Sequence, residues 1–168
     1  MTEVANSGPR LAERRVLVVG AGTQRSDDPE APIGNGRAIA VLAAREGASV
    51  VCADRDRAAA EETAAWISDE GGEASIVVAD VAAAEQCASL VMEATAAGEL
   101  DGLVLNVGIG RGGGIAGTSA DDWDLTFAVN LRSHFLVVRE ALTRLSDGAA
   151  IVFISSVAGL QPGSRLPA

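Results

Sequence analysis

The fold is decided by residues 16–40, VLVVGAGTQRSDDPEAPIGNGRAIA. The four apolar residues that open this stretch are typical of a strand buried on both faces. Gly20 and Gly22 follow at once, and Gly34 and Gly36 precede a helical pattern. A helix start offers backbone N–H donors and a partial positive charge, and glycine lets an anion approach the backbone closely. The stretch therefore predicts a strand, a glycine turn and a helix that together bind a phosphate group.

Composition places the chain among small soluble proteins. Its 168 residues suggest one domain, which we assign to residues 15–168, after a loose tail at 1–14. The net charge of −10 argues against a nucleic-acid surface. The sequence has neither the apolar run of about 20 residues that spans a membrane nor the apolar segment of a signal peptide. We therefore expect a cytoplasmic protein that binds neither nucleic acid nor membrane.

Apolar runs alternate with helical patterns five times along the chain. This alternation predicts an α/β fold, a doubly wound, Rossmann-like parallel sheet in three α/β/α layers. The predicted strands are 15–19, 49–53, 74–79, 102–105 and 149–154. Small polar residues end the later strands: Asp54, Asp80, Asn106, Ser155 and Ser156. Because ligands bind beyond the carboxyl ends of such strands, these residues are expected at one binding rim.

The helix before the last strand carries a long apolar stripe. Ser119 and Asp122 have the spacing of a capping box at its start. The stripe consists of Leu131, Phe135, Val138, Leu142 and Leu145. We expect one helix that carries all of them. Its His134, the only histidine, is expected to pack rather than to catalyse, and Cys52 and Cys87 are expected to be reduced core residues.

The glycine spacing favours a dinucleotide. The simple G-x-G-x-x-G pattern fails because position 25 is arginine, but a delayed G-x-G occurs at Gly34-Asn35-Gly36. Asp54 closes the second strand, where a carboxylate can accept hydrogen bonds from an adenosine ribose and would repel a 2′-phosphate. This favours NAD over NADP. The neighbouring Arg55 could instead pair with that phosphate, and Asp54 could be merely a solvated strand end.

Taken together, the motifs resemble those of the short-chain dehydrogenase/reductase family. Val19-Gly20 and the glycines at 34 and 36 correspond to its T-G-x-x-x-G-x-G. The remaining matches are Asp80-Val81 after the third strand, Asn106-Val107-Gly108 in place of N-A-G, Asn130 in the long helix and Ser156 as the catalytic serine. The resemblance covers about residues 15–162, and the combination is far more specific than any single motif.

The resemblance implies an oxidoreductase that transfers a hydride between a nicotinamide cofactor and an alcohol or ketone. Ser156 would then position the substrate oxygen, and Asn130 would support a proton-relay water. The cofactor site would comprise Gly20, Gly22, Gly34, Asn35, Gly36, Asp54, Arg55, Asp80, Val81, Asn106, Val107 and Gly108. No metal is implied. The partners would be a small alcohol or carbonyl substrate and, for the full-length protein, further copies in a homo-oligomer.

The chain departs from the family pattern in two ways. About ten extra residues, 24–33, lie inside the glycine turn, and their acidic members Asp27, Asp28 and Glu30 would oppose a pyrophosphate unless the insert loops outward, as we expect. The family's Tyr-x-x-x-Lys would begin at position 169, and the chain contains no tyrosine and no lysine. We therefore expect a C-terminally incomplete, truncated domain with little or no activity by itself.

Two alternatives remain at this stage. The chain could be a catalytically inactive short form that binds NAD or a partner chain. It could also be another doubly wound enzyme, such as a methyltransferase that uses the same glycine turn. Asn106-Val107-Gly108 and the two serines after the last strand speak against the methyltransferase.

Overall fold

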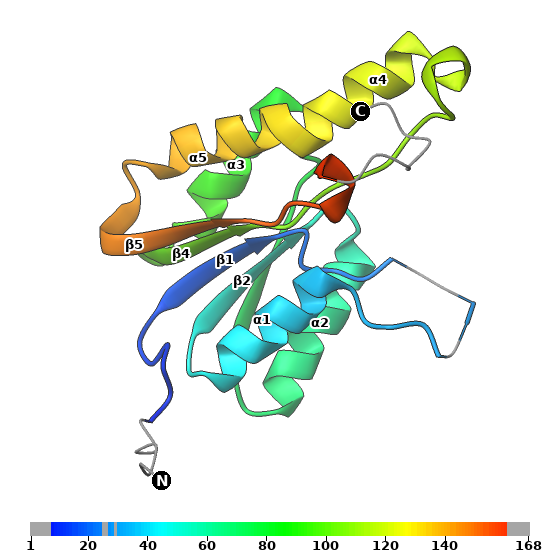
Figure 1. The fold of residues 1–168 in the computed structure, drawn as a ribbon. Coiled ribbons are helices and arrows are strands. Elements are labelled where there is room, and N and C mark those ends of the chain that lie inside the picture. Colours follow the sequence, from blue (N-terminus) through cyan, green and yellow to red (C-terminus); the bar gives the residue numbers. More distant parts are fainter. Residues whose placement is uncertain (1–7, 25–26, 29, 161–168) are drawn as a thin grey trace, which may run out of the picture.

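The computed structural model of the chain describes residues 8–24, 27–28 and 30–160 (Figure 1). Parts of three sequence predictions lie outside these residues. They are the first seven residues of the predicted tail, three residues of the insert and the last eight residues of the predicted domain.

The described residues form one parallel sheet in the order β3-β2-β1-β4-β5. Its strands are β1 (Arg15–Val19), β2 (Ser49–Asp54), β3 (Glu73–Val78), β4 (Leu100–Leu105) and β5 (Leu145–Phe153). The chain runs outward from β1 to β3, then returns to the other side of β1 with β4. The strand order therefore reverses between β1 and β4, where doubly wound sheets bind their ligands.

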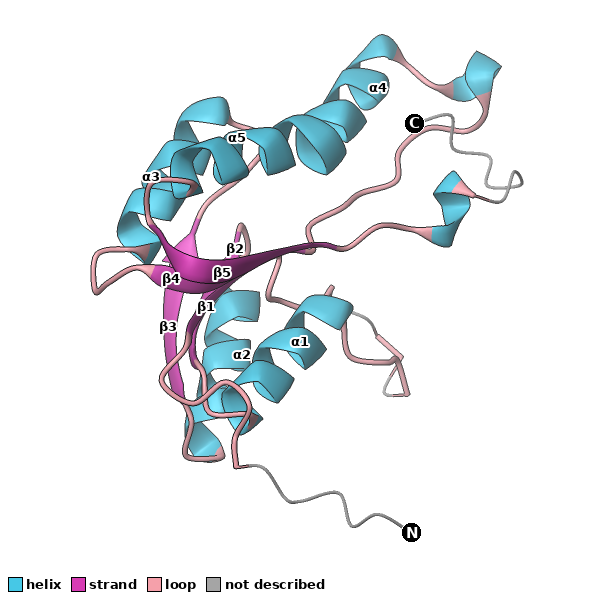
Figure 2. Ribbon diagram, turned by 60° about the vertical axis from the view of Figure 1, so that its left-hand side comes forward, coloured by secondary structure: helices cyan, strands magenta, loops and turns pink. Residues whose placement is uncertain are grey.

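Helices cover both faces of the sheet, which confirms the predicted three-layer α/β/α fold (Figure 2). One face carries α1 (Asn35–Arg45) and α2 (Arg57–Asp69), and the other carries α3 (Ala84–Ala94) and α5 (Ser133–Ala141). The remaining helical segments are α4 (Ala120–Phe127), the π-helical turn η2 (Ala128–Arg132) and the short 3₁₀ helices η1 (Ile115–Gly117) and η3 (Val157–Gly159).

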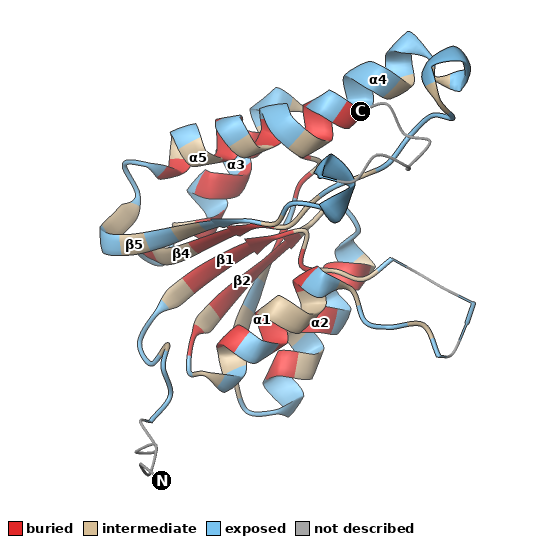
Figure 3. Ribbon diagram, in the orientation of Figure 1, coloured by how far each residue is buried: buried red, intermediate tan, exposed pale blue. Residues whose placement is uncertain are grey.

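Each face of the central strands packs into its own core. Leu17 and Val19 point toward α3 and α5, whereas Val16 and Val18 point toward α1 and α2. This alternation buries β1 on both sides, as its continuous apolar run predicts (Figure 3). The two cysteines lie one in each core, and burial raises the pKa of the Cys52 thiol to about 12 and also raises that of Cys87. Both are free and protonated, as expected.

The helix predicted after Ser119 forms, but it contains a π-helical turn and ends before Leu145. The capping box forms, because the Ser119 hydroxyl accepts the Asp122 N–H at 3.1 Å, but the segment then divides into α4, η2 and α5. The helix ends at Ala141, and Leu145 already belongs to β5, which begins four residues earlier than predicted.

Only part of the predicted stripe packs on the core: Val138 and Leu145 are partly buried against it, whereas the other three members face outward. The side of α5 that packs on the sheet consists of Ser133, Leu136, Val137 and Ala141. Leu131, Phe135 and Leu142 are about 60% exposed, at 61%, 62% and 60%. The segment is apolar on two sides, and helical spacing identifies residues that share a side without showing which side meets the sheet.

No helix within the described parts of the chain is long and apolar enough to cross a membrane.

Asp101 ties the beginning of β1 to β4 and β5. Its carboxylate accepts the Arg15 N–H at 2.9 Å, the Arg14 guanidinium at 2.8 Å and the Ser146 hydroxyl at 2.9 Å. The bond from the Arg15 backbone, followed by that from the Arg14 side chain, holds the pKa of Asp101 below its ordinary value of 3.8. The folded state therefore binds this proton less readily than the unfolded state does.

We predict that Asp101 stabilises the fold in a pH-dependent way. Its contribution is complete above the ordinary pKa and is lost as the pH falls through the lower folded-state pKa. Asp101→Asn should lower the free energy of unfolding by roughly 1–2 kcal/mol at pH 7, and this deficit should shrink below about pH 4. Urea titrations of both proteins at several pH values measure the difference. A deficit that stays constant down to pH 2 would contradict the prediction.

Candidate dinucleotide site

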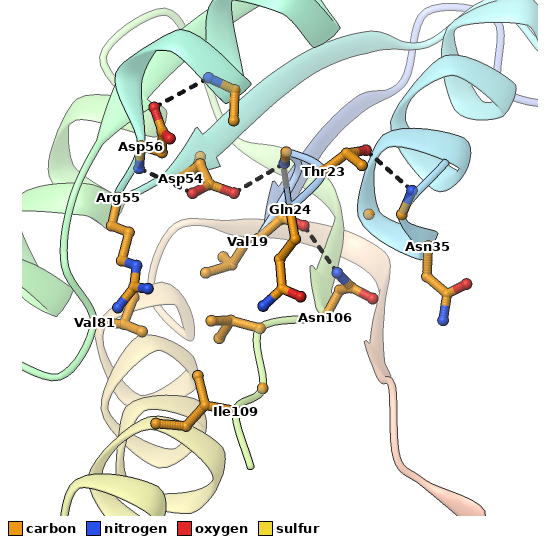
Figure 4. A pocket seen from close by; sticks show the side chains of 18 of the residues that line it. Val19, Thr23, Gln24, Asn35, Asp54, Arg55, Asp56, Val81, Asn106 and Ile109 are labelled. Carbon is orange, nitrogen blue, oxygen red and sulfur yellow. Dashed lines mark hydrogen bonds between the residues drawn. The ribbon is translucent and has the colours of Figure 1, made fainter. Parts of the chain in front are cut away.

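A cavity of about 970 Å³ opens at the carboxyl ends of β1, β2 and β4. All twelve residues that the sequence predicts for the cofactor site line it: Gly20, Gly22, Gly34, Asn35, Gly36, Asp54, Arg55, Asp80, Val81, Asn106, Val107 and Gly108. Figure 4 shows Asp54 and Arg55 on one side of this cavity, with Asn106 and Asn35 on the other. The cavity lies at the carboxyl ends of β1 and β4, between which the strand order reverses.

The first half of the glycine turn is held by hydrogen bonds at every peptide. The N–H groups of Gly20 and Ala21 both donate to the Ala53 carbonyl, at 2.8 and 3.0 Å. The Gly20 carbonyl accepts the Asn106 side-chain amide at 2.8 Å, and Gly22 donates its N–H to Asp54 at 2.9 Å. These N–H groups are already paired, so they are not free to bind a phosphate.

Backbone donors that have no acceptor among the described residues lie instead at the start of α1. The Ala38 N–H donates to the Gly34 carbonyl at 3.0 Å, which leaves the N–H groups of Asn35, Gly36 and Arg37 without an intrahelical acceptor. Gly34 caps this helix without a side-chain hydrogen bond, whereas Asp56 caps α2 with its carboxylate. Three backbone donors and the positive end of the helix dipole therefore face the cavity edge.

Glycine at position 36 is required by the close packing of α1 on β1. A Cβ added there would overlap the Gly20 carbonyl oxygen and approach the Asn106 amide nitrogen to 2.7 Å. At Gly22, an added Cβ would lie 2.6 Å from the Ala59 methyl group of α2. The two glycines bring both helices against the turn and leave its inner side open.

The two carboxylate oxygens of Asp54 accept hydrogen bonds from two different backbone N–H groups at the cavity rim. Its Oδ2 accepts the Gly22 N–H at 2.9 Å, and its Oδ1 accepts the Asp56 N–H at 3.0 Å (Figure 4). Each oxygen has two lone pairs, so both retain acceptor capacity for a ligand. The Arg55 side chain extends along the same wall toward Val81.

A hydrogen bond joins the two ends of the insert where it leaves and re-enters the glycine turn. The Gly34 N–H donates to the Thr23 hydroxyl at 3.0 Å, which joins the two ends of the detour. Gln24, Ala31 and Pro32 line the cavity, and sequence analysis missed these three because nothing in the family pattern corresponds to them. The acidic residues Asp27, Asp28 and Glu30 are exposed and are not among the lining residues, and Figure 1 shows this segment projecting away from the sheet.

Asp80 and Val81 form the wall next to α3. The Asp80 carboxylate accepts the Ala82 N–H at 3.0 Å, and the Asp80 backbone N–H donates to the Gln86 side chain at 2.8 Å. Val81 is 5% exposed and presents an apolar surface to the cavity. Val81 therefore offers an apolar contact in the cavity, next to the hydrogen-bonded carboxylate of Asp80.

Two side chains one helical turn apart hold the loop after β4. Asn130, in η2, accepts the Ile109 N–H and donates to the Ile109 carbonyl, both at 2.8 Å. His134, in α5, lies with Nε2 3.2 Å from the Val107 carbonyl, so this nitrogen carries the ring proton. Burial lowers the pKa of His134 despite that bond. Asn130 thus acts on the cavity through Ile109, which lines it.

Ser156 is not brought to the cavity wall. It follows β5, is exposed, and accepts the Ala158 N–H at 3.1 Å as the cap of η3. The sequence-predicted site is therefore divided into a cofactor part that lines one cavity and a serine that stands outside it.

Comparisons with known proteins agree with this architecture. The sequence profile of the family described as short chain dehydrogenase matches residues 31–168. An uncharacterized oxidoreductase of Thermotoga maritima is 38% identical over 148 residues, which are 86% of this chain and 54% of that protein. The 2-(S)-hydroxypropyl-CoM dehydrogenase 3 of Xanthobacter autotrophicus is 36% identical, over 90% of this chain and 56% of its own length.

Solved structures give the same result. A short-chain dehydrogenase/reductase from Serratia marcescens superimposes with a TM-score of 0.80 at 32% identity, covering 91% of this chain and 60% of the other. A metagenomic short-chain oxidoreductase in complex with NADP superimposes with a TM-score of 0.82 at 30% identity, covering 93% and 68%. The chain spans about half the length of the curated relatives cited above. With its matched profile, sheet order and cavity, the chain belongs to the short-chain dehydrogenase family.

Proposed function

We propose that this chain binds NAD in the cavity at the ends of β1, β2 and β4, as the cofactor part of an oxidoreductase that acts on an alcohol or ketone. The observation that carries the proposal is the convergence of the twelve predicted residues on one cavity that has free backbone N–H donors at its edge. A dinucleotide needs an anion site next to a sugar site, and both the start of α1 and Asp54 line this cavity.

The donor set fits a pyrophosphate. The N–H groups of Asn35, Gly36 and Arg37 point out of the start of α1, and glycine at position 36 lets this helix start pack against the turn. This site needs no lysine, which the chain lacks. The acidic residues of the insert do not line the cavity, so they do not enclose the anion.

Asp54 supports NAD rather than NADP. Its two fixed oxygens can accept hydrogen bonds from the hydroxyls of the adenosine ribose, and its charge would repel a 2′-phosphate. Arg55 lines the same wall and is the residue that would favour NADP. We propose that the carboxylate dominates, because both of its oxygens are held in place by backbone N–H groups.

A bound nicotinamide would supply the hydride donor or acceptor of the reaction. In this chain, Asn130 would hold the loop that forms the cavity wall, and Ser156 would serve the substrate oxygen. General acid/base catalysis contributes about 10²–10⁴-fold to such reactions. Because the chain has no tyrosine and no lysine, we propose that it binds the cofactor but shows little turnover by itself. In that respect the alternative of an NAD-binding short form predicts the same result.

The outward face of α4, η2 and α5 supports self-association. The Trp123 and Phe127 rings contact each other in a tilted arrangement, with their centroids 4.8 Å apart, and Leu131, Phe135 and Leu142 continue the apolar surface. We propose that a second copy of the full-length protein covers this face, as the family resemblance implies.

Calorimetric titration of the chain with NAD, NADP and S-adenosylmethionine tests the function. Saturable NAD binding without turnover on a panel of alcohols is expected. Failure to bind either nicotinamide dinucleotide would overturn the proposal, and binding of S-adenosylmethionine alone would favour a methyltransferase.

Asp54→Ala is predicted to weaken NAD binding by roughly tenfold or more, because hydrogen bonds to a charged group contribute about 1.5–3 kcal/mol. The affinity gap between NAD and NADP should narrow at the same time. Asp54→Asn removes the charge that repels a 2′-phosphate, but its single side-chain oxygen can keep only one of the two backbone bonds, to Gly22 or to Asp56. Asp69→Ala, at an exposed position at the end of α2, is the matched control. An unchanged ratio of the NAD and NADP affinities in both Asp54 variants would show that Asp54 is a solvated residue at the end of β2 and does not select the cofactor.

A further inference from the structure

One peptide of the glycine turn is held at both ends by side chains. The peptide that joins Ala21 to Gly22 presents its carbonyl to α2 and its N–H to β2. The Thr63 hydroxyl lies 3.0 Å from the carbonyl oxygen, and Asp54 Oδ2 accepts the N–H at 2.9 Å. The orientation of this peptide plane is therefore set jointly by Thr63 and Asp54.

Arg37 orients the Thr63 hydroxyl. The Arg37 Nε–H donates to Thr63 Oγ1 at 3.0 Å, so the single hydroxyl proton is directed toward the carbonyl acceptors. These are Ala21 and, within α2, Ala59, each at 3.0 Å. Thr63 is fully buried, and the Arg37 side chain is 13% exposed and paired with Glu62 at 2.8 Å. Water has little access to replace this donor.

The held peptide in turn fixes the carboxylate of Asp54. Among the described residues, that side chain has two hydrogen-bond partners, Gly22 and Asp56, and each occupies a different oxygen. If the Ala21–Gly22 peptide rotates, the Gly22 N–H leaves Oδ2 and the carboxylate can turn about its remaining bond. The lone pairs that face the cavity then change direction.

We propose that Thr63, a residue that does not line the cavity, is a positioning residue for the adenosine end of the cofactor. Its hydroxyl, oriented by Arg37, holds the Ala21–Gly22 peptide so that Asp54 meets the ribose in one orientation. This inference rests on the proposed function, because it assigns the Asp54 carboxylate to the ribose. It adds a residue of α2 that no motif of the glycine turn contains.

Thr63→Val tests the proposal, because it removes the hydroxyl while keeping the shape of the side chain. NAD binding should weaken roughly fivefold, the effect of losing about one hydrogen bond, and the preference for NAD over NADP should fall by a similar factor. Thr63→Ser should restore both values. Thr126→Val is the matched control, since Thr126 is 2% exposed and bonds only within α4. A loss of packing alone would lower the melting temperature in both valine variants without changing the NAD to NADP ratio.

A double-mutant cycle shows whether Thr63 acts through Asp54. In an Asp54→Ala background, Thr63→Val should change NAD affinity by less than about twofold, because the group that it positions is gone. The full fivefold effect in that background would overturn the proposal. So would a Thr63→Val single variant with wild-type affinity and ratio.

The Gly22 amide gives a readout that needs no substitution. In the wild-type chain without cofactor, this amide should exchange with solvent much more slowly than the Asn35 amide, which has no acceptor in the part of the chain that the structure describes. Equal exchange rates would overturn the inference even if Thr63→Val failed to fold. Absence of NAD binding to the wild-type chain would instead refute the proposed function.

Discussion

Gly36→Ala is expected to abolish dinucleotide binding and to destabilise the fold by roughly 2–4 kcal/mol, the range for steric overlap in a packed region. The new methyl group would occupy the position of the Gly20 carbonyl oxygen and press on the Asn106 amide. The start of α1 must then move away from β1, and its free N–H groups leave the cavity edge. Thermal unfolding and calorimetry with NAD measure the two effects.

Gly117→Ala is the control for this substitution. Gly117 lies in the short helix η1, and an added Cβ would meet no heavy atom within 4 Å. Its melting temperature and NAD affinity should match those of the wild type. A Gly36→Ala protein with both properties unchanged would show that the packing of α1 on the turn is not as close as described.

Asn130→Ala is expected to have the second largest effect. The variant loses both hydrogen bonds to Ile109 and leaves that residue's N–H and carbonyl without their side-chain partner. The free energy of unfolding should fall by roughly 2–3 kcal/mol, and NAD affinity by about tenfold, because the loop wall of the cavity is released. Chemical denaturation and calorimetry measure these changes.

Asn130→Asp refines the same test. An aspartate can still accept the Ile109 N–H but cannot donate to its carbonyl, so its stability should lie between those of the wild type and the alanine variant. Wild-type stability in both variants would mean that Asn130 does not hold the loop.

The sheet could be predicted from sequence because its signal is local. The run of apolar residues in β1 can be buried only between two layers, and glycine or polar residues end the strands close to where the structure ends them. The core position of Cys87 in α3 was also predicted correctly. The other buried residues of this helix, Leu90, Val91 and Ala94, lie on the same side. A one-sided pattern leaves a single way to pack.

The α4–α5 segment could not be predicted in the same way. Leu136 and Val137 pack on the sheet, while Phe135 faces outward beside them. A helix with apolar residues on two sides has two candidate core faces, and the choice depends on what the sheet presents. The π-helical turn at Ala128–Arg132 also shifts the phase of the spacing between the two helices.

The residues that line the cavity could be predicted in part, but their hydrogen bonds could not. The glycine spacing indicated a phosphate near residues 20–36, yet it could not show that the Gly20 and Gly22 N–H groups are already used within the protein. Thr63 and His134 were missed as partners of the site because they act on backbone atoms of distant residues. Such contacts leave no spacing pattern in the sequence.

The paired peptides of the glycine turn also bear on the thermodynamics of association. Asn106, Thr63 and Asp54 each restrain a different backbone group of three consecutive residues before any guest arrives. Little conformational entropy therefore remains to be lost at this turn when a dinucleotide docks, and the receptor is preorganised there.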